Sequence, residues 1–362
     1  MSRVTEPEGV RTAVPVELPP SPERAAEAVV QVNGAPAPPS WADTLKCYAS
    51  IARPDHWFKN VFMLLGVLLV LFYHPEVFRG EELVSTALKL TGAVIATCLI
   101  ASSNYVINEI LDAATDRNHY AKKHRPIPSG RVKLPIAYAE WILLGITGLA
   151  MAAALNWPFF YSGLFLLVMG LVYNIPPIRS KELPYLDVLS EAINNPIRLL
   201  LGWFALTPTE VPPLSLLIAY WMVGAFFMAS KRFAEYRSIG DPAAAAAYRS
   251  SFKHYTEEKL LVSMFFYTTC FALFLGVFII RYKLELILIF PLVAGFVCYY
   301  LHISFKKESP VQNPERLYKE RGLMAYLVVC VVSFFMLMFV RIPELYHLFN
   351  VKQVEMPKLW EF

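Results

Sequence analysis

The chain has 362 residues, of which 56% are hydrophobic and 17% are charged. Soluble domains average about 45–50% apolar and about 25% charged residues, so this composition and a mean hydropathy of +0.44 exclude an ordinary soluble protein. The net charge of +4 is too small and too dispersed for nucleic-acid binding, and we expect no nucleic-acid partner.

The N-terminal stretch differs in composition from the rest of the chain. Residues 1–40 are rich in Pro, Ala, Glu and Val, which cannot bury a core, and they predict a disordered tail. A short amphipathic segment over 41–51 is predicted to lie at a membrane interface. It opens a transmembrane domain over 41–347, which a short C-terminal tail follows over 348–362.

Long apolar segments dominate that domain, each near the ~20 residues that a bilayer demands. They lie at about 58–76, 84–108, 134–154, 157–175, 186–206, 212–234, 259–280, 284–304 and 322–342. This pattern predicts an all-α integral membrane protein with nine transmembrane helices.

Basic residues fall unevenly between these segments. The loop after the second segment carries Lys122, Lys123 and Arg125, and the loop after the eighth carries Lys306 and Lys307. Connections on the other side contain few Lys or Arg. Because basic loops stay in the cytoplasm, we expect a cytoplasmic N-terminus, and a site that opens to the cytoplasm because the chemically notable motifs lie in the same loops.

The end of the second segment carries acidic and amide side chains in helical register. Asn108, Asp112 and Asp116 are spaced i, i+4 and i+8, which places them on one face of a helix. Carboxylates at a membrane helix end are costly without partners, and Mg²⁺ shared with substrate phosphates is a natural one. The alternative is a solvated helix end followed by an ordinary basic loop.

The fifth segment carries a second polar stripe. Its members are Asp187, Glu191, Asn194 or Asn195, and Arg198. Such a stripe inside a membrane span marks a cavity or a site, and Pro196 should kink the helix there. The alternative is a simple pair between Glu191 and Arg198.

Two acidic pairs on separate helices, each beside a basic loop, indicate a two-magnesium clamp around a diphosphate. A transporter would also place carboxylates in membrane helices. It would spread its polar residues across both halves of the bilayer, whereas these acids gather at one end. An enzyme is therefore the favoured class, and a transporter remains an alternative.

At these motifs the chain resembles the UbiA-type membrane prenyltransferase superfamily. The family's NDxxDxxxD motif reads here as Asn108-Glu109-x-x-Asp112-x-x-x-Asp116, and its second motif as Asp187-x-x-x-Glu191. The segment from Tyr173 to Lys181 is similar to the element that precedes the second motif. The resemblance covers about residues 45–342. It implies nine helices around a central lipid-open cavity, Mg²⁺ dependence and an isoprenoid substrate.

Further segments resemble one branch, the polyprenyl-phosphate phosphoribosyltransferases. These are "RPDHWFKN", "DRNHYAKKHRPIPSG" and "KRFAEYR". The branch implies phosphoribosyl diphosphate as donor and an isoprenoid phosphate as acceptor. In contrast, "YNIPPIRSK" is similar to the branch that moves a polyprenyl group from its diphosphate to an aromatic acceptor, and this is the alternative. A bacterial inner membrane is the expected location.

The expected site follows from both the residues and the resemblance. Asp112, Asp116, Asp187 and Glu191 would carry Mg²⁺, with Asn108 as an auxiliary ligand. The expected phosphate contacts are Lys122, Arg125, Arg179 and Lys181. A second phosphate would be held by Lys59, Lys231 and Arg232. The remaining expected substrate contacts are Asn60, Tyr173, Asn195 and Arg198. Tyr173 or an acid would be the base that a phenol acceptor requires.

Overall fold

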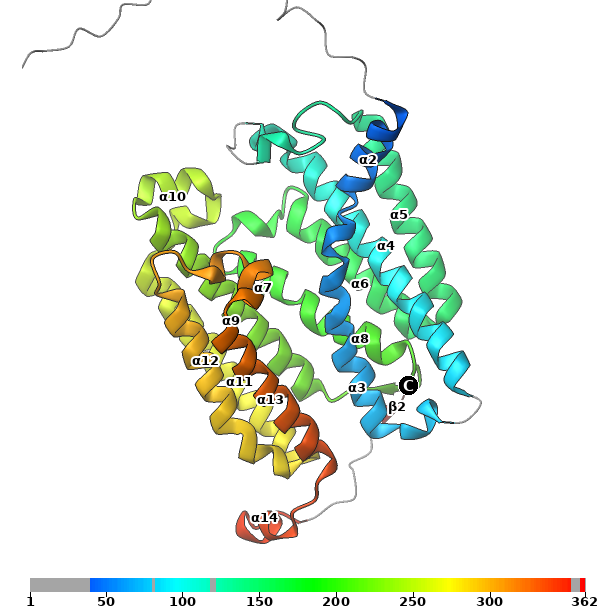
Figure 1. Ribbon diagram of the computed structural model, residues 1–362, viewed down its shortest axis with the longest axis vertical. Coiled ribbons are helices and arrows are strands. Elements are labelled where there is room, and N and C mark those ends of the chain that lie inside the picture. Colours follow the sequence, from blue (N-terminus) through cyan, green and yellow to red (C-terminus); the bar gives the residue numbers. More distant parts are fainter. Residues whose placement is uncertain (1–39, 80–81, 118–121, 353–358, 362) are drawn as a thin grey trace, which may run out of the picture. The chain divides into compact units, whose positions relative to one another are not determined.

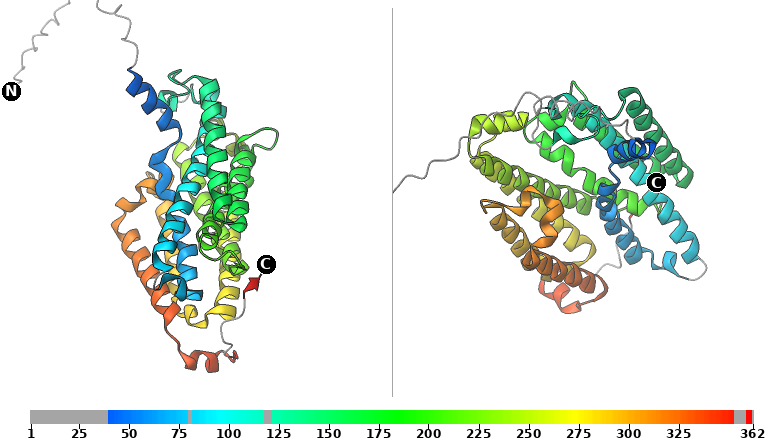
Figure 2. Two further views of the ribbon diagram at one scale, coloured as in Figure 1. Left: turned by 90° about the vertical axis from the view of Figure 1, so that its right-hand side faces the viewer. Right: turned by 45° about the horizontal axis from the view of Figure 1, so that its top comes forward.

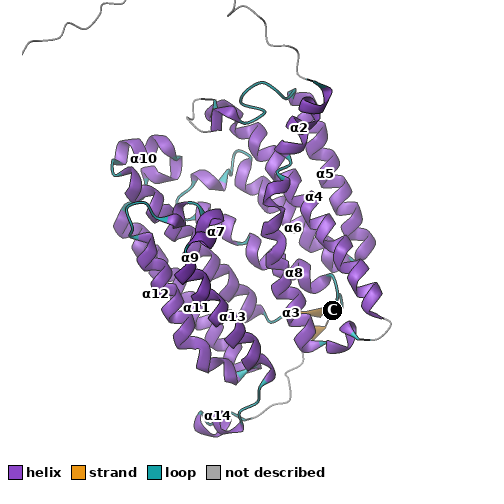
Figure 3. Cartoon of the chain, in the orientation of Figure 1, coloured by secondary structure: helices purple, strands orange, loops and turns teal. Residues whose placement is uncertain are grey.

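The computed structural model describes residues 40–79, 82–117, 122–352 and 359–361. Residues 1–39 of the predicted tail over 1–40, and part of the C-terminal tail over 348–362, lie outside these residues. The chain divides into two units, each with most of its contacts within itself. They are a short N-terminal unit, Met1–Leu45, and a large unit, Lys46–Phe362, which carries the candidate site. Helices make up nearly all of the regular structure in the described residues (Figure 3).

Eight helical stretches in the described part of the chain are long and apolar enough to cross a membrane. Six are single helices: α4 (Glu82–Asp116), α5 (Leu134–Leu155), α6 (Trp157–Asn174), α9 (Leu214–Ile239), α11 (Glu257–Tyr282) and α13 (Arg321–Phe339). One is composed of α2 (Trp41–Ile51), the 3₁₀ helix η1 (Pro54–Met63) and α3 (Leu64–Tyr73). The last joins η6 (Leu284–Ile289) to α12 (Phe290–Ser304). The prediction of an all-α membrane architecture is thus confirmed.

The fifth predicted segment is divided into two short helices. They are α7 (Leu186–Ala192) and α8 (Asn194–Phe204), and the chain turns between them at Ile193. Neither helix alone has the ~20 residues that cross a bilayer. The break precedes Pro196 and leaves the proline in the first turn of α8, where the missing N–H costs little. Ile193 itself keeps right-handed helical φ and ψ angles.

Two groups of helices flank this divided segment. Helices α4, α5 and α6 form one group, and α9, α11, α12 and α13 form the other (Figure 1). The segment contacts both, since α6 and α9 each touch α7 and α8. Helices α5 and α6 form a tight hairpin. Its turn residue, Asn156, accepts a hydrogen bond from the N–H of Phe159 at 2.8 Å and donates one to the carbonyl of Phe204 at 2.8 Å.

Helix α8 lies against η1 and α3 with the two backbones in contact. A Cβ atom at Gly66 would stand 2.1 Å from the carbonyl oxygen of Leu199, and one at Gly202 would stand 2.0 Å from that of Met63. No side chain fits in either gap, so glycine is required at both positions. This close approach fixes α8 beside η1.

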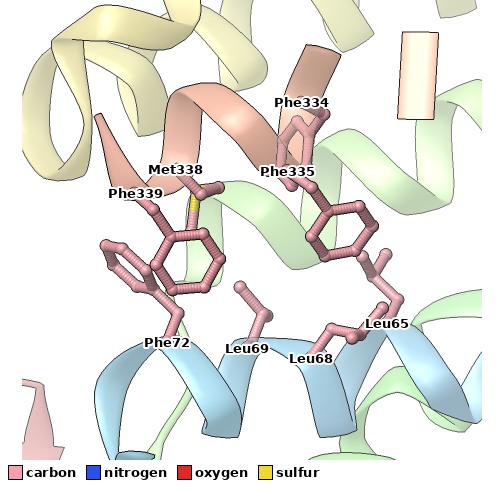
Figure 4. A pocket seen from close by; sticks show the side chains of 8 residues that line it. All are labelled: Leu65, Leu68, Leu69, Phe72, Phe334, Phe335, Met338 and Phe339. Atoms are coloured by element: carbon pink, nitrogen blue, oxygen red, sulfur yellow. The ribbon is translucent and has the colours of Figure 1, made fainter. Parts of the chain in front are cut away.

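An apolar seam joins α3 to α13, which are far apart in the sequence (Figure 4). It is lined by Leu65, Leu68, Leu69, Phe72, Phe334, Phe335, Met338 and Phe339. The rings of Phe72 and Phe339 meet edge to face, with centroids 5.9 Å apart. Large apolar side chains such as Leu143, Phe265 and Met336 are exposed on the outer faces of the helices, which suits contact with lipid.

Short elements complete the architecture (Figure 2). A short helix after α9 is α10 (Pro242–Tyr248), with Asp241 as its N-cap. Strand β1 (Glu210–Val211) pairs antiparallel with β2 (Trp360–Glu361), and α14 is Pro343–Leu348. The other 3₁₀ helices are η2 (Pro75–Phe78), η3 (Lys122–His124), η4 (Ser180–Glu182), η5 (Ser250–Lys253), η7 (Pro310–Gln312) and η8 (Pro314–Lys319).

Candidate functional site

The acids of the first motif lie on the last turns of α4, which continues without interruption to Asp116. Asp112 accepts hydrogen bonds from Lys181 Nζ at 2.5 Å and from Arg179 Nη2 at 3.1 Å. Asp116 accepts one from Arg125 Nη1 at 2.8 Å, and Lys122 Nζ lies 3.7 Å from it. The residues predicted to hold phosphate are therefore the ones that face these acids.

The loop after α6 connects the two acidic helices. Its residues Arg179 and Lys181 contact Asp112 on α4, while Ser180 donates a hydrogen bond to Ser190 of α7 at 2.8 Å. Arg179 has a φ of 36°, a value that residues other than glycine rarely adopt. Burial lowers the pKa of Lys181, and the charge of Asp112 opposes that effect. Asp112 thus partly offsets the effect of burial on the ammonium group.

Asn174 is a member of this cluster that the sequence reasoning missed. Its Oδ1 accepts hydrogen bonds from Asn108 Nδ2 at 2.5 Å and from Lys181 Nζ at 3.0 Å. It is the last residue of α6 and directly follows Tyr173 in the segment that resembles the family. Its place in that segment is the sequence feature that could have identified it as a site residue.

Glu109 takes no part in the cluster, although it stands inside the first motif. Its side chain is buried, and Oε1 accepts a hydrogen bond from the N–H of Ile127 at 3.1 Å. The carboxylate therefore holds the loop that carries Arg125. Glu109 therefore acts on the position of that loop, and it makes no direct contact with Asp112 or Asp116 among the described hydrogen bonds.

Asp187 has several protein donors as partners. Its side chain is fully buried, with 0% exposure. Oδ1 accepts a hydrogen bond from the Tyr255 hydroxyl at 2.7 Å, and Oδ2 accepts from Arg232 Nε at 3.1 Å and Ser251 Oγ at 3.2 Å. Arg249 Nε lies 3.4 Å from Oδ2. Both carboxylate oxygens are engaged by protein donors, so in this arrangement Asp187 positions arginines.

Tyr255, Ser251 and Arg249 were not foreseen, because they lie after α10 in a loop without a motif. Burial, followed by the charge of Asp187, raises the pKa of Tyr255 above its ordinary range. The phenol therefore stays protonated and donates to Asp187 at neutral pH.

Arg232 joins three carboxylates. Besides Asp187, its Nη2 donates to Glu191 Oε2 at 2.8 Å and its Nη1 to Glu235 Oε2 at 3.3 Å. Lys231 Nζ lies 3.9 Å from Glu235, a residue that was also missed. The alternative pairing of Glu191 with Arg198 is wrong, because Glu191 pairs across helices with Arg232.

Glu191 is the most open acid of the second motif, with 35% of its side chain exposed. The Tyr173 hydroxyl donates to its Oε2 at 3.3 Å. Lys59 and Lys231 lie near enough for their charges to act on it. The predicted contacts from three separate parts of the chain therefore surround this carboxylate.

Three other predicted residues lie apart from the acids. Arg198 Nε donates to Asn60 Oδ1 at 3.0 Å, and Arg198 Nη1 donates to the carbonyl of Asn194 at 3.2 Å. Asn195 packs against α9, where a Cβ at Gly224 would stand 2.5 Å from its Nδ2. The polar stripe of the fifth segment is thus split between two environments.

The acids suit Mg²⁺ by donor chemistry. Within the described ranges, no three His, Cys, Asp or Glu side chains gather closely enough to hold a metal ion by themselves. Mg²⁺ is usually bound by one or two carboxylates together with substrate phosphates, and it does not require such a cluster. Asp112 and Glu191 are partly exposed, at 19% and 35%. They offer oxygen ligands of the kind that Mg²⁺ prefers.

Comparison with known proteins identifies the group to which this chain is related. The sequence pattern of the UbiA prenyltransferase family matches residues 61–329, well over half of the chain. Decaprenyl-phosphate phosphoribosyltransferase of Mycobacterium tuberculosis is 31% identical over 209 residues, which are 58% of this chain and 65% of that protein. Digeranylgeranylglyceryl phosphate synthase of Sulfurisphaera tokodaii is 31% identical over 129 residues, 34% of this chain and 45% of that protein. The matched parts span less than two thirds of these relatives.

The fold also has a solved counterpart. A UbiA homolog from Archaeoglobus fulgidus, solved with GPP and Mg²⁺, superposes with a TM-score of 0.59 over 81% of this chain and 100% of that one, at 20% identity. The similarity shows a shared fold. Together with the family match and the apolar helices, it establishes that the chain is an integral membrane protein of the UbiA prenyltransferase family.

Proposed function

We propose that the chain is a Mg²⁺-dependent membrane transferase that moves a phosphoribosyl group from phosphoribosyl diphosphate to a polyprenyl phosphate. The observation that carries this proposal is the set of basic side chains drawn to the two acidic helices. Arg125, Arg179 and Lys181 face the acids of α4, and Arg232 and Arg249 face those of α7. Acidic side chains next to Arg and Lys side chains suit a substrate that binds as a complex of phosphate groups with a metal cation.

The donor side of the site is the α4 end with its two basic loops. Asp112, Asp116 and Glu191, with Asn108, are the residues that would hold Mg²⁺, which when bound neutralises charge on the diphosphate. Arg125 and Arg179 can turn from the carboxylates to phosphate oxygens, for which the guanidinium group has a matching bidentate geometry. Lys181 supplies a further point charge. These side chains orient the donor and stabilise the departing diphosphate.

The chemistry needs no general base from the protein. The C–O bond between ribose and diphosphate breaks with its electron pair leaving on oxygen, and positive charge develops at the carbon. A phosphate oxygen of the acceptor, already ionised, forms the new bond. In agreement, Asp112, Asp116, Asp187 and Glu191 are all engaged in ion pairs with Arg or Lys side chains.

The relatives support the same assignment. The Mycobacterium tuberculosis protein at 31% identity is named for decaprenyl phosphate as the acceptor of a phosphoribosyl group. The segments that resemble this branch include Lys231 and Arg232, which lie beside Glu235 and Glu191, and Asn60, which contacts Arg198.

A second candidate is transfer of a prenyl group to an aromatic acceptor. Tyr173, in the segment that resembles this branch, lies 3.3 Å from Glu191. Such a phenol–carboxylate pair is where a phenol acceptor would find its base. The two candidates share the donor chemistry and differ in the acceptor.

The arrangement in the membrane is part of the proposal. The divided segment α7–α8 would serve as the ninth span, and the helices would surround a central cavity open to lipid. The positive-inside rule supports a cytoplasmic N-terminus and a cytoplasmic opening of the site. A bacterial inner membrane is the proposed location, in line with bacterial relatives such as the Mycobacterium tuberculosis protein.

One experiment tests the activity directly. Purified protein in detergent is given Mg²⁺ and radiolabelled phosphoribosyl diphosphate, with and without polyprenyl phosphate, and label is followed into the organic phase. We expect label that needs both Mg²⁺ and polyprenyl phosphate and that is lost in Asp112→Asn. Label that enters lipid only from a prenyl diphosphate with an aromatic acceptor would replace this proposal with the second candidate.

A further inference from the structure

A positive charge lies buried in α8 without a negative partner. Arg198 is 8% exposed, and no carboxylate in the described part of the chain stands within ion-pair distance of it. The other buried basic side chains that the structure describes differ in this respect. Arg232 contacts three carboxylates, and Lys283 lies 3.4 Å from Glu285.

The partners of Arg198 are neutral. They are the Asn60 side chain at 3.0 Å and the backbone carbonyl of Asn194 at 3.2 Å. Tyr105, Tyr220 and Cys98 lie near enough to act on it electrostatically, but phenols and thiols carry no charge at neutral pH. An arginine does not lose its proton in proteins, and a buried, uncompensated charge is costly. A charge kept under these conditions in a membrane protein marks a functional site.

The fold holds this guanidinium in place before any ligand arrives. The glycine contacts at Gly66 and Gly202 press α8 against η1, which brings Asn60 beside Arg198. Asn60 is itself oriented by a hydrogen bond from its Nδ2 to Cys98 Sγ at 3.1 Å. The contact between Arg198 and the carbonyl four residues earlier directs the side chain back along α8 toward the end that carries the acids.

We propose that Arg198, oriented by Asn60, binds the phosphate monoester headgroup of the acceptor lipid. This inference rests on the proposed function and deepens it by separating two anion sites. The donor's diphosphate would use the cations at the α4 end. The acceptor's phosphate would approach from the apolar side, because Arg198 lies on α8, past the turn at Ile193 that separates it from Glu191 on α7. A guanidinium group binds phosphate through paired hydrogen bonds.

This assignment changes the one expected from the sequence, in which Lys59, Lys231 and Arg232 hold the second phosphate. Arg232 is matched by Asp187, Glu191 and Glu235, so it has no spare charge to offer. Lys231 lies 3.9 Å from Glu235. Arg198 has a free charge and needs an anion.

The test measures binding without Mg²⁺ and without donor. Farnesyl phosphate is the probe, and thermal shift and calorimetric titration of the full chain in detergent are the readouts. Farnesol tests the need for phosphate, inorganic phosphate tests the need for the lipid, and 4-hydroxybenzoate tests an aromatic carboxylate. The variants are Arg198→Gln, which keeps a hydrogen-bond donor near Asn60, and Arg198→Lys, which keeps the charge.

We expect farnesyl phosphate to stabilise the wild type, and farnesol and inorganic phosphate to have no effect at the same concentration. Arg198→Gln should weaken farnesyl phosphate binding at least tenfold, and Arg198→Lys should weaken it less. The ligand-free melting temperature of Arg198→Gln should equal or exceed that of the wild type, because a buried charge has been removed. An arginine with only a structural role predicts the opposite change in melting temperature.

A third variant supplies the missing carboxylate. Asn60→Asp places an acid beside Arg198, and should raise the ligand-free melting temperature while weakening farnesyl phosphate binding tenfold or more. If Arg198→Gln does not fold, the Asn60→Asp variant tests the proposed phosphate site in its place. Unchanged binding in Arg198→Gln or Asn60→Asp overturns the inference, as does Arg198-dependent binding of 4-hydroxybenzoate in place of farnesyl phosphate. Arg198-dependent phosphate binding without phosphoribosyl transfer would instead remove the proposed function and leave the anion site standing.

Discussion

Lys181 donates a hydrogen bond to Asp112 at 2.5 Å, although 69 positions separate them in the chain. The contact closes the loop after α6 onto the end of α4 and sets a cation beside the first acidic pair. Because Asp112 remains partly exposed, a phosphate-bearing ligand can take its place as the partner of Lys181.

Lys181→Met should weaken donor binding. Loss of this charge removes one phosphate contact, and we expect the KM for the diphosphate donor to rise by about ten- to a hundredfold, as a charge-assisted hydrogen bond of about 1.5–3 kcal/mol implies. Steady-state kinetics with varied donor measure this. Lys181→Arg should recover part of the loss, and Lys307→Met, at an exposed position, is the matched control. A donor KM that stays unchanged in Lys181→Met would contradict the role given to the loop.

Asp187→Asn should act mainly on stability. It leaves the buried Arg232 and the half-buried Arg249 short of a counter-ion, and breaking a buried ion pair costs about 3–5 kcal/mol. Asp112→Asn lies at a more open position and should lower the melting temperature much less while abolishing the stabilisation given by Mg²⁺ with diphosphate. Thermal unfolding of both variants, with and without these ligands, separates the roles. Equal melting temperatures for the two variants would return Asp187 to the metal-ligand role.

Tyr255→Phe removes two contacts at once, the hydrogen bond to Asp187 at 2.7 Å and the one accepted from the N–H of Tyr185 at 2.5 Å. We expect a loss of about 1–3 kcal/mol, measured by denaturant unfolding, with exposed Tyr318→Phe as control.

The stability that Tyr255 adds should also depend on pH. Its pKa is raised in the folded protein, so its contribution is fully present below the unfolded value of about 10. The contribution decreases as pH rises through the folded value. A difference between wild type and Tyr255→Phe that grows above pH 10 would show that the phenol is not the donor.

Gly202→Ala should prevent α8 from approaching η1. The new methyl group would stand 2.0 Å from a backbone carbonyl oxygen that cannot move independently, so we expect a loss of several kcal/mol, in the upper range of single substitutions. Gly276→Ala is the matched control, because nothing lies within 4 Å of a Cβ there. That change should stabilise helix α11 by about 0.5–1 kcal/mol. Melting temperatures of the two variants should therefore move in opposite directions.

The parts of the site that the sequence predicted are those set by local geometry. Asn108, Asp112 and Asp116 share a face because the helical period alone places them there. The basic partners of the two acids come from the loop that follows α4 and from the segment that precedes the family's second motif. Apolar length likewise located the long helices without tertiary information.

The missed residues depend on contacts between distant parts of the chain. Ser251 and Tyr255 reach Asp187 across 64 and 68 positions, and nothing in their loop distinguishes them from ordinary polar residues. The expected pair of Glu191 and Arg198 presumed a continuous helix. In the structure, the turn at Ile193 separates the helices that carry them. Glu191 pairs with Arg232 on α9, and Arg198 pairs with Asn60 on η1.

That turn has a consequence for how the protein can change. Helix α7 is fastened to α9 by Arg232 and by the Trp221 indole, which donates to the carbonyl of Leu189 at 2.9 Å. Helix α8 is fastened to η1 and α3 by its glycine contacts. The two halves of this segment are therefore attached to different parts of the protein, α7 to α9 and α8 to η1 and α3. Under the proposed assignment, substitutions around α8 can change which acceptor lipid binds without changing the residues beside α7 that act on the diphosphate. The same fold can therefore accommodate different acceptors.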